Sequence, residues 1–243
     1  MSMELRNQKP FIVAITGASG SVYGLRLVKV LAELGYPITL TISHAAGLVI
    51  REELGIEVDV RKGDPFSNMS SPRKRESRDA GSLIKAFGDD ILFDSKTISL
   101  ITYYPEQEMT APIASGSYPT RGMIVMPAST TCFAKIANGI SEGLIERAAE
   151  CVIKEGRRLA LVPRETPLSA IHLENLLKLA RLGVRIVPAI PAFYSGAQKM
   201  EELVDFVIGK VLDQFEIPHT LYKRWVGSLS PHLNPPPQGG RRD

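Results

Sequence analysis

Cysteine is scarce in this chain of 243 residues, which has two, Cys132 and Cys151. Their spacing fits neither a metal site nor a disulfide framework. No apolar run approaches the ~20 residues that a membrane-spanning helix needs. The first ten residues also lack the apolar stretch of a signal peptide. These absences predict a cytoplasmic protein with reduced thiols.

A surplus of charge is missing from most of the chain as well. The net charge is +3, and the basic segment 61–79 accounts for it. Its PRKRESR run contains no aromatic residues, so we interpret it as a solvated loop rather than a nucleic-acid-binding patch. An apolar content of 44% is ordinary for a globular protein. We therefore expect neither a nucleic acid nor a membrane as a partner.

Short apolar runs alternate with helical patterns along most of the chain. Strands are expected at 11–16, 37–43, 122–126, 159–163 and 185–190. Helices are expected at 20–34, 44–54, 131–138, 142–156 and 199–215, with a further one that opens at Thr166-Pro167 and stops at Gly183. The interval 83–101 is expected to add a helix and an edge strand. This alternation predicts an α/β protein with a doubly wound parallel sheet.

The length suits a single domain, which we expect to span 1–227. Residues 59–82 are rich in Ser, Pro, Arg and Lys without a sustained period, which indicates a surface insertion. The Pro- and Gly-rich tail at 228–243 is expected to be disordered. Ligands of doubly wound sheets bind at the carboxyl ends of the strands. The function is therefore expected in the loops 17–21, 43–44, 127–132, 164–167 and 191–196.

The first of these loops, TGASGSVYG at 16–24, is close to the fingerprint of an NAD(P)-dependent reductase. A nicotinamide cofactor usually needs an acidic residue at the end of the second strand, where this chain has Ser43 and His44. Short-chain reductases also pair a Tyr with a Lys four residues later, and no YxxxK occurs here. Both absences disfavour a reductase. A flavin mononucleotide site or a bare phosphate site remains open.

Two small turns suit a phosphorylated ligand. Residues 17–19 and 129–131 carry hydroxyl groups, and each turn precedes a helix. Free backbone N–H groups and the positive end of the helix dipole attract phosphate there. Ordinary helix capping, which needs one Ser or Thr in each turn, is the alternative.

Charged and aromatic residues follow the later strands. Arg164 and Glu165 come directly after the buried run LALVP, which favours a functional charge pair at the ligand edge. Phe193 and Tyr194 stand at the next strand end, where they form an aromatic wall or cover the sheet edge. The histidines His44, His172 and His219 have no zinc spacing.

These loops belong to a series of motifs that resembles one family, the flavin prenyltransferases of the UbiX/Pad1 type. The motifs are TGASGSVYG, TISHAA, APIASGSYPT, MPASTTCFAKIANG, LIERAAECVIKE, LVPRETPLSAIHLENLLKLARLG, PAFYSG, VDFVIGKVLDQF and the final Arg224-Trp225. They cover nearly all of 11–225 except the stretch 56–108. The resemblance implies a flavodoxin-like, Rossmann-type three-layer sandwich that assembles as a homododecamer.

The resemblance also implies an activity. Such a protein joins a dimethylallyl group from dimethylallyl monophosphate to N5 and C6 of reduced FMN, without a metal. The product, prenylated FMN, is the cofactor of UbiD-type decarboxylases in ubiquinone or aromatic-acid metabolism. Two alternatives stay open: an FMN-dependent cysteine-type decarboxylase, and a non-catalytic FMN-binding carrier subunit.

The resemblance further assigns roles to residues of this chain. The implied FMN site comprises Gly17, Ala18, Ser19, Ser43, Ser129, Thr130, Thr131, Cys132, Arg147 and Arg164. The implied dimethylallyl phosphate site comprises Ser115, Gly116, Lys154, Arg164, Tyr194, Lys210 and Trp225. The implied catalytic residues are Ser19, Glu53, Lys154 and Glu165. The chain also departs from the family pattern: Cys132 ends a turn that more often ends in a hydroxyl, Lys210 stands where arginine is also common, and Gly156 interrupts the run before LALVP.

Overall fold

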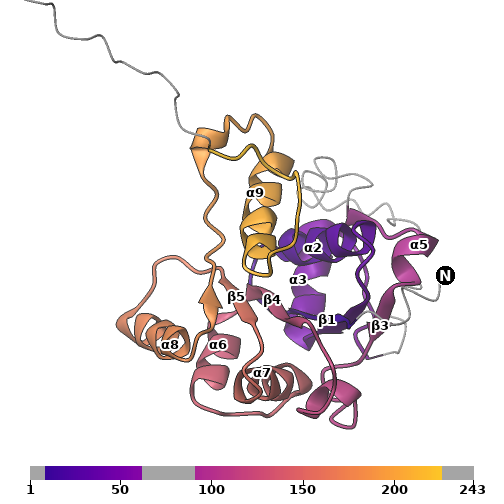
Figure 1. Ribbon diagram of the computed structural model, residues 1–243, viewed down its shortest axis with the longest axis vertical. Coiled ribbons are helices and arrows are strands. Elements are labelled where there is room, and N and C mark those ends of the chain that lie inside the picture. The colour runs from indigo at the N-terminus through magenta and orange to yellow at the C-terminus, as the bar shows by residue number, and fades with distance from the viewer. Residues whose placement is uncertain (1–8, 62–90, 226–243) are drawn as a thin grey trace, which may run out of the picture.

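The computed structural model describes residues 9–61 and 91–225, and in these residues one parallel sheet forms the centre of the molecule (Figure 1). Its strands are β1 (Phe11–Ile15), β2 (Ile38–Ile42), β3 (Ile101–Tyr103), β4 (Gly122–Ala128), β5 (Leu159–Pro163) and β6 (Arg185–Ile186). Their order across the sheet is β3-β2-β1-β4-β5-β6, and every pair is parallel. The doubly wound sheet predicted from the sequence is thus confirmed.

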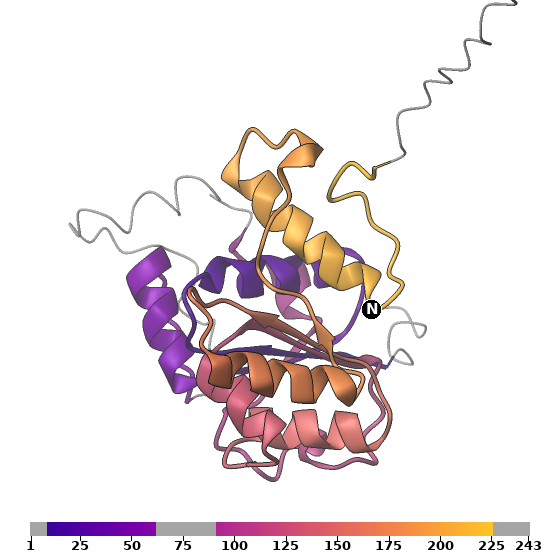
Figure 2. The same cartoon turned by 90° about the vertical axis from the view of Figure 1, so that its left-hand side faces the viewer.

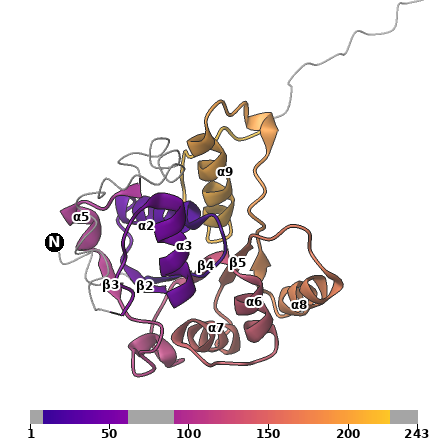
Figure 3. The same cartoon turned by 180° about the vertical axis from the view of Figure 1, so that it is seen from behind.

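Helices cover both faces of the sheet, which makes three layers (Figures 1 and 2). One layer contains α2 (Ser21–Glu33), α3 (His44–Leu54) and α9 (Met200–Asp213), with α5 (Ser95–Ile98) beside α2. The opposite layer contains α6 (Thr130–Ala137), α7 (Leu144–Lys154) and α8 (Ala170–Arg181), as the view from behind also shows (Figure 3). Two short 3₁₀ helices, η2 (Pro112–Ala114) and η3 (Phe193–Ser195), lie in the connections.

The core is divided between the two faces of the sheet. In β1, Phe11, Val13 and Ile15 face one apolar cluster, while Ile12 and Ala14 face the other. Successive side chains of a strand point to opposite faces, so a strand covered on both sides must be apolar at every position. This explains why the strands appear in the sequence as unbroken apolar runs.

Two details of the sequence prediction are wrong. The strand expected at 185–190 is found only as β6, Arg185–Ile186. Beyond it the chain still follows β5 loosely, since the Val187 amide donates to the Leu161 carbonyl and the Ala189 amide to the Pro163 carbonyl. The helix expected to open at Thr166-Pro167 begins instead at Ala170, with Ser169 as its cap. Ser169 Oγ accepts from the His172 amide, and His172 Nδ1 accepts in return from the Ser169 amide. The predicted insertion at 59–82 lies mostly outside the described residues, and the predicted tail at 228–243 lies wholly outside them.

Candidate functional site

The strand order reverses between β1 and β4, and this switch point is where doubly wound sheets bind their ligands. Thr16, directly after β1, fastens the two strand ends together. Its hydroxyl donates to the Pro127 carbonyl at 2.7 Å and accepts from the Ser129 amide at 2.7 Å. The loops at 16–20 and 128–132 therefore share one crevice wall.

The glycines of the first loop allow close approaches of the backbone. A Cβ at Gly17 would lie 2.5 Å from Cβ of Ala45, so this glycine lets the loop contact the start of α3. A Cβ at Gly24 would lie 2.5 Å from the Met126 carbonyl oxygen, so this one lets α2 pack on β4. Gly20 has φ of +91°, which favours glycine for its conformation rather than its size.

Glu53 of α3 caps the N-terminus of α2. Its carboxylate accepts from the Gly20 amide at 2.9 Å, from the Ser21 amide at 2.9 Å and from the Ser21 hydroxyl at 2.7 Å. Burial acts to raise the pKa of Glu53, but hydrogen bonds from Ser19, Ser21 and Gly20 outweigh it and lower the pKa below its ordinary value. The side chain is therefore an anion at the site where the sequence suggested a phosphate.

At the N-terminus of α6, no carboxylate of the described residues accepts from the first-turn amides. Ser129 Oγ accepts from the Cys132 amide at 3.3 Å and so caps the helix. The amides of Thr130 and Thr131 lie in the first turn, where an α-helix offers no intrahelical acceptor. Of the two hydroxyl-bearing turns, the one at 129–132 is the better site for an anion.

Ser43 forms a further wall of the crevice. It caps α3 by accepting from the Ala46 amide at 3.1 Å, and the next amide, that of His44, donates to Glu106 at 3.1 Å. The carbonyl of Glu106 accepts from the Leu144 amide at 2.8 Å and so joins α7 to the same region. Glu106 lies in a stretch without a motif, so no local pattern pointed to it.

Glu146, in the first turn of α7, is a second acidic side chain that the sequence did not single out. It is 6% exposed, and its Oε2 atom has no hydrogen-bond partner among the described residues. Burial raises its pKa. A carboxyl that holds its proton more tightly than usual thus lies beside the crevice.

Arg164 follows β5 and reaches back to the first loop. Its Nε donates to the Ser19 carbonyl oxygen at 2.9 Å, which leaves the two terminal nitrogens of the guanidinium for other partners. Glu165 is exposed and accepts from the Thr166 amide through one oxygen at 2.9 Å. The structure therefore brings Arg164 to the loop at 17–19, and the catalytic role of Glu165 stays a prediction.

Lys154, another charged residue of the predicted site, lies far from Arg164 in the fold. Lys154 ends α7 just before β5 begins, at the amino edge of the sheet. Arg164 lies at the carboxyl edge, beyond the five residues of β5, which span roughly 16 Å. A Cβ at Gly116 would lie 3.1 Å from Cε of Lys154, so the loop at 115–116 packs beside the lysine at the same edge of the sheet. One copy of the chain does not bring these residues to Arg164.

Arg147 has structural partners. Its Nε donates to the Ala114 carbonyl at 3.0 Å, and its Nη1 pairs with Glu150 at 2.9 Å. These bonds fasten η2 to α7. The FMN contact predicted for Arg147 remains a prediction.

Tyr194, Lys210 and Trp225 form a separate group over α9. The Tyr194 ring packs edge-on against Trp225 and against Phe206, each at 5.9 Å between ring centroids. Lys210 follows Phe206 by one helical turn, and its ammonium lies 6.0 Å from the centre of the Tyr222 ring. The donor-binding role that the resemblance assigns to these three residues stays a prediction.

The crevice contains no activated thiol, because Cys132 is buried and burial raises its pKa. Within 9–61 and 91–225, no three His, Cys, Asp or Glu side chains gather as a metal site would require. None of the helices in those ranges is long and apolar enough to cross a membrane.

Comparisons with known proteins agree with this geometry. A family model described as Flavoprotein matches residues 1–212. The chain is 44% identical to the flavin prenyltransferase UbiX of Halalkalibacterium halodurans over 215 residues, 88% of this chain and 92% of the relative.

Two solved structures are similar along nearly the whole chain. The first is AnUbiX (PadA1) in complex with FMN and dimethylallyl pyrophosphate, with a TM-score of 0.73, 32% identity and coverage of 91% of this chain and 99% of that one. The second is a dodecameric FMN-dependent UbiX-like decarboxylase from Escherichia coli O157:H7, with a TM-score of 0.71, 35% identity and coverage of 90% and 100%.

Proposed function

Because the chain belongs to the Flavoprotein family and within it to the UbiX flavin prenyltransferases, we propose that it transfers a dimethylallyl group to reduced FMN. The donor is dimethylallyl monophosphate: its C–O bond to phosphate breaks as a bond to N5 of the flavin forms, and its alkene then takes up a proton as a second bond forms at C6. The product is prenylated FMN. One observation carries the proposal: Arg164 is fastened to the loop at 17–19, beside a helix N-terminus suited to an anion.

The residues at the switch point fit a flavin mononucleotide. The Thr130 and Thr131 amides and the Ser129 and Ser43 hydroxyls supply donors for its polar groups. Gly17 lets the first loop pack against the start of α3, which brings the two walls of the crevice together. Reduced FMN supplies the nucleophile, so the buried Cys132 thiol needs no catalytic role.

Departure of the phosphate places a dianion in the site, and cations must stabilise it. Arg164 can serve this purpose, since the two terminal nitrogens of its guanidinium bond no group within the described part of the chain. Bond formation at C6 requires removal of a proton, which a nearby carboxylate accepts. Glu165 suits this role because one of its oxygens is free, whereas Glu53 already accepts from the α2 amides.

The separation of Lys154 from Arg164 implies that copies of the chain complete each other's sites. We infer that Lys154, Ser115 and Gly116 of one copy meet Arg164 of a neighbour in a homododecamer. Exposed apolar side chains on α8 offer a surface for such packing. They are Ile171, Leu173 and Leu177, at 70%, 53% and 50% exposure. The UbiX-like relative from Escherichia coli is dodecameric.

A UbiD-type decarboxylase would receive the prenylated FMN, in ubiquinone or aromatic-acid metabolism. We place the protein in the cytoplasm, where such a decarboxylase would meet it. We also propose that 1–227 form one domain, consistent with the continuous sheet of the described residues.

An anaerobic assay tests the function. The full-length protein is incubated with reduced FMN and dimethylallyl monophosphate, and the mass of the released flavin is measured. The expected result is a gain of one five-carbon prenyl unit. Unmodified FMN from folded, FMN-loaded protein would contradict the transferase. In that case, loss of carbon dioxide from a cysteine-containing peptide would support the alternative decarboxylase.

A further inference from the structure

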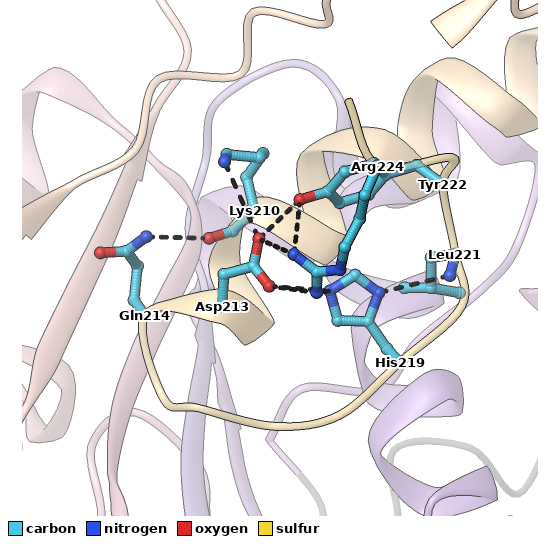
Figure 4. A network of polar contacts seen from close by, with 7 residues as sticks. All are labelled: Lys210, Asp213, Gln214, His219, Leu221, Tyr222 and Arg224. Carbon is cyan, nitrogen blue, oxygen red and sulfur yellow. Dashed lines mark hydrogen bonds and ion pairs between the residues drawn. The ribbon is translucent and has the colours of Figure 1, made fainter. Parts of the chain in front are cut away.

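Asp213, the last residue of α9, gathers polar side chains from its own helix and from the segment that follows (Figure 4). The Tyr222 hydroxyl donates to its Oδ2 at 2.6 Å, and Arg224 Nη2 donates to its Oδ1 at 2.7 Å. His219 Nε2 lies 3.2 Å from Oδ1. Lys210 Nζ is more distant, at 3.8 Å from Oδ2.

The imidazole of His219 is oriented from both sides. Its Nδ1 accepts from the Leu221 amide at 3.3 Å, so the hydrogen is on Nε2 and points to Asp213. The side chain is 2% exposed. Burial acts to raise the pKa of Asp213, but hydrogen bonds from Arg224, Tyr222 and His219 hold it at about 2. The carboxylate is therefore charged at neutral pH.

The helix surface is shaped to receive these rings. A Cβ at Gly209 would lie 2.5 Å from Cδ1 of Tyr222 and 2.7 Å from Cε1 of His219. Alanine would favour a helix interior more than glycine does, but here it would displace both rings. The glycine thus allows the segment at 216–225 to lie directly on α9.

Trp225 is the residue after Arg224, and its ring packs on Tyr194 at 5.9 Å. Holding Arg224 on Asp213 therefore also holds the indole beside the aromatic group over α9. The same bonds also determine how closely Lys210 can pair with Asp213. Because Arg224, Tyr222 and His219 engage both oxygens of Asp213, the lysine is left with only a long ion pair and remains available to an anion.

We propose that Asp213 and Arg224 form a clamp that positions Trp225 and keeps Lys210 available for the phosphate of the prenyl donor. Asp213 is a positioning residue, since it acts through Lys210 and Trp225 rather than on the donor. The role in donor binding rests on the proposed prenyl transfer. The docking of the segment at 216–225 does not.

The test uses Asp213→Asn in the full-length, FMN-loaded protein. Trp225 is the only tryptophan of the chain, so its fluorescence anisotropy reports docking directly. The variant is expected to lower this anisotropy, as the indole gains nanosecond motion. It is also expected to raise KM for dimethylallyl monophosphate about tenfold, with the Kd for FMN unchanged.

Further variants separate the clamp from a general loss of structure. Arg224→Gln, at an exposed position, should reproduce both effects, and Arg224→Lys should be intermediate because it keeps the charge. Glu216→Gln is the matched control, since Glu216 belongs to the same segment but pairs with Arg158, the residue before β5, at 2.6 Å, rather than with Asp213. It should change neither readout.

Two results would overturn the clamp: wild-type anisotropy in both Asp213→Asn and Arg224→Gln, or lowered anisotropy with an unchanged KM. Lowered anisotropy together with a wild-type protein that turns over no prenyl donor would refute the proposed function and the donor-binding role, while supporting the docking.

Discussion

At the scale of single residues, Glu53 shows how a sequence motif and its structural role can differ. The glycine loop suggests a phosphate at the N-terminus of α2, yet the four hydrogen bonds there end on the Glu53 carboxylate. A fixed negative charge completes the helix end and excludes a second anion from it. We therefore predict that the charge of a bound ligand lies at α6 and Arg164.

The first prediction concerns this cap. Glu53→Gln should lower the free energy of unfolding by about 1–2 kcal/mol at pH 7, because an amide replaces a charged acceptor of several hydrogen bonds. Urea unfolding measures the loss. Glu52→Gln is the matched control, since that side chain is 74% exposed and its ion pair in the described residues is with the neighbouring Arg51. The control should stay within about 0.5 kcal/mol of the wild type.

The lowered pKa of Glu53 also predicts how the difference in unfolding free energy between the wild type and Glu53→Gln depends on pH. A carboxyl with a folded pKa below its unfolded value stabilises the fold above the unfolded value, about 4.3 for glutamate. This stabilisation is lost as the pH falls through the lower, folded value. The gap between wild type and Glu53→Gln should therefore close below pH 4. A gap that persists there would show that shape rather than charge accounts for the effect.

At the scale of elements, the helix that follows β4 contains the best anion site of the crevice. Ser129→Ala should remove the α6 cap, at a cost of about 1 kcal/mol in stability. It should also raise the Kd for FMN several-fold, because the first turn of α6 loses its fixed geometry. Flavin fluorescence quenching measures the Kd.

Ser99→Ala provides the comparison for this variant. Ser99 donates to the Lys96 carbonyl at 2.7 Å, away from the strand ends that form the crevice. Its substitution should leave the Kd for FMN unchanged. Equal Kd values for Ser129→Ala and the wild type would place the flavin phosphate elsewhere.

The elements themselves were largely predictable because local patterns determine them. The run LALVP becomes β5 at 159–163, and the interval 44–54 becomes α3, which Ser43 caps. The error at Thr166 arose because a Thr-Pro pair and a later serine both have capping chemistry, and only tertiary packing selects between them. Glu106 and Glu146 could not be predicted, since their importance depends on contacts between distant segments rather than on any local pattern.

At the scale of the whole molecule, residues that share a motif in the sequence can lie at opposite edges of the sheet, and residues from distant motifs can lie in contact. Arg164 and Ser19 are 145 positions apart yet hydrogen-bonded, and Lys154 is ten positions from Arg164 yet at the opposite edge. Lys154 and Arg164 flank the same strand, β5, so the length of that strand separates them. Proximity in sequence was thus a poor guide to proximity in the site.

This separation leads to a prediction about the assembly. Lys154→Ala and Arg164→Ala should each abolish prenyl transfer when pure, if both residues act on the same donor. Co-assembled from an equal mixture, the two variants should recover roughly a quarter of the wild-type activity, because one site in four draws an intact lysine and an intact arginine from different copies. Activity is measured as prenylated FMN by mass. Native mass spectrometry of differently tagged variants verifies the mixing, and mixed oligomers without activity would show that sites are not shared between copies.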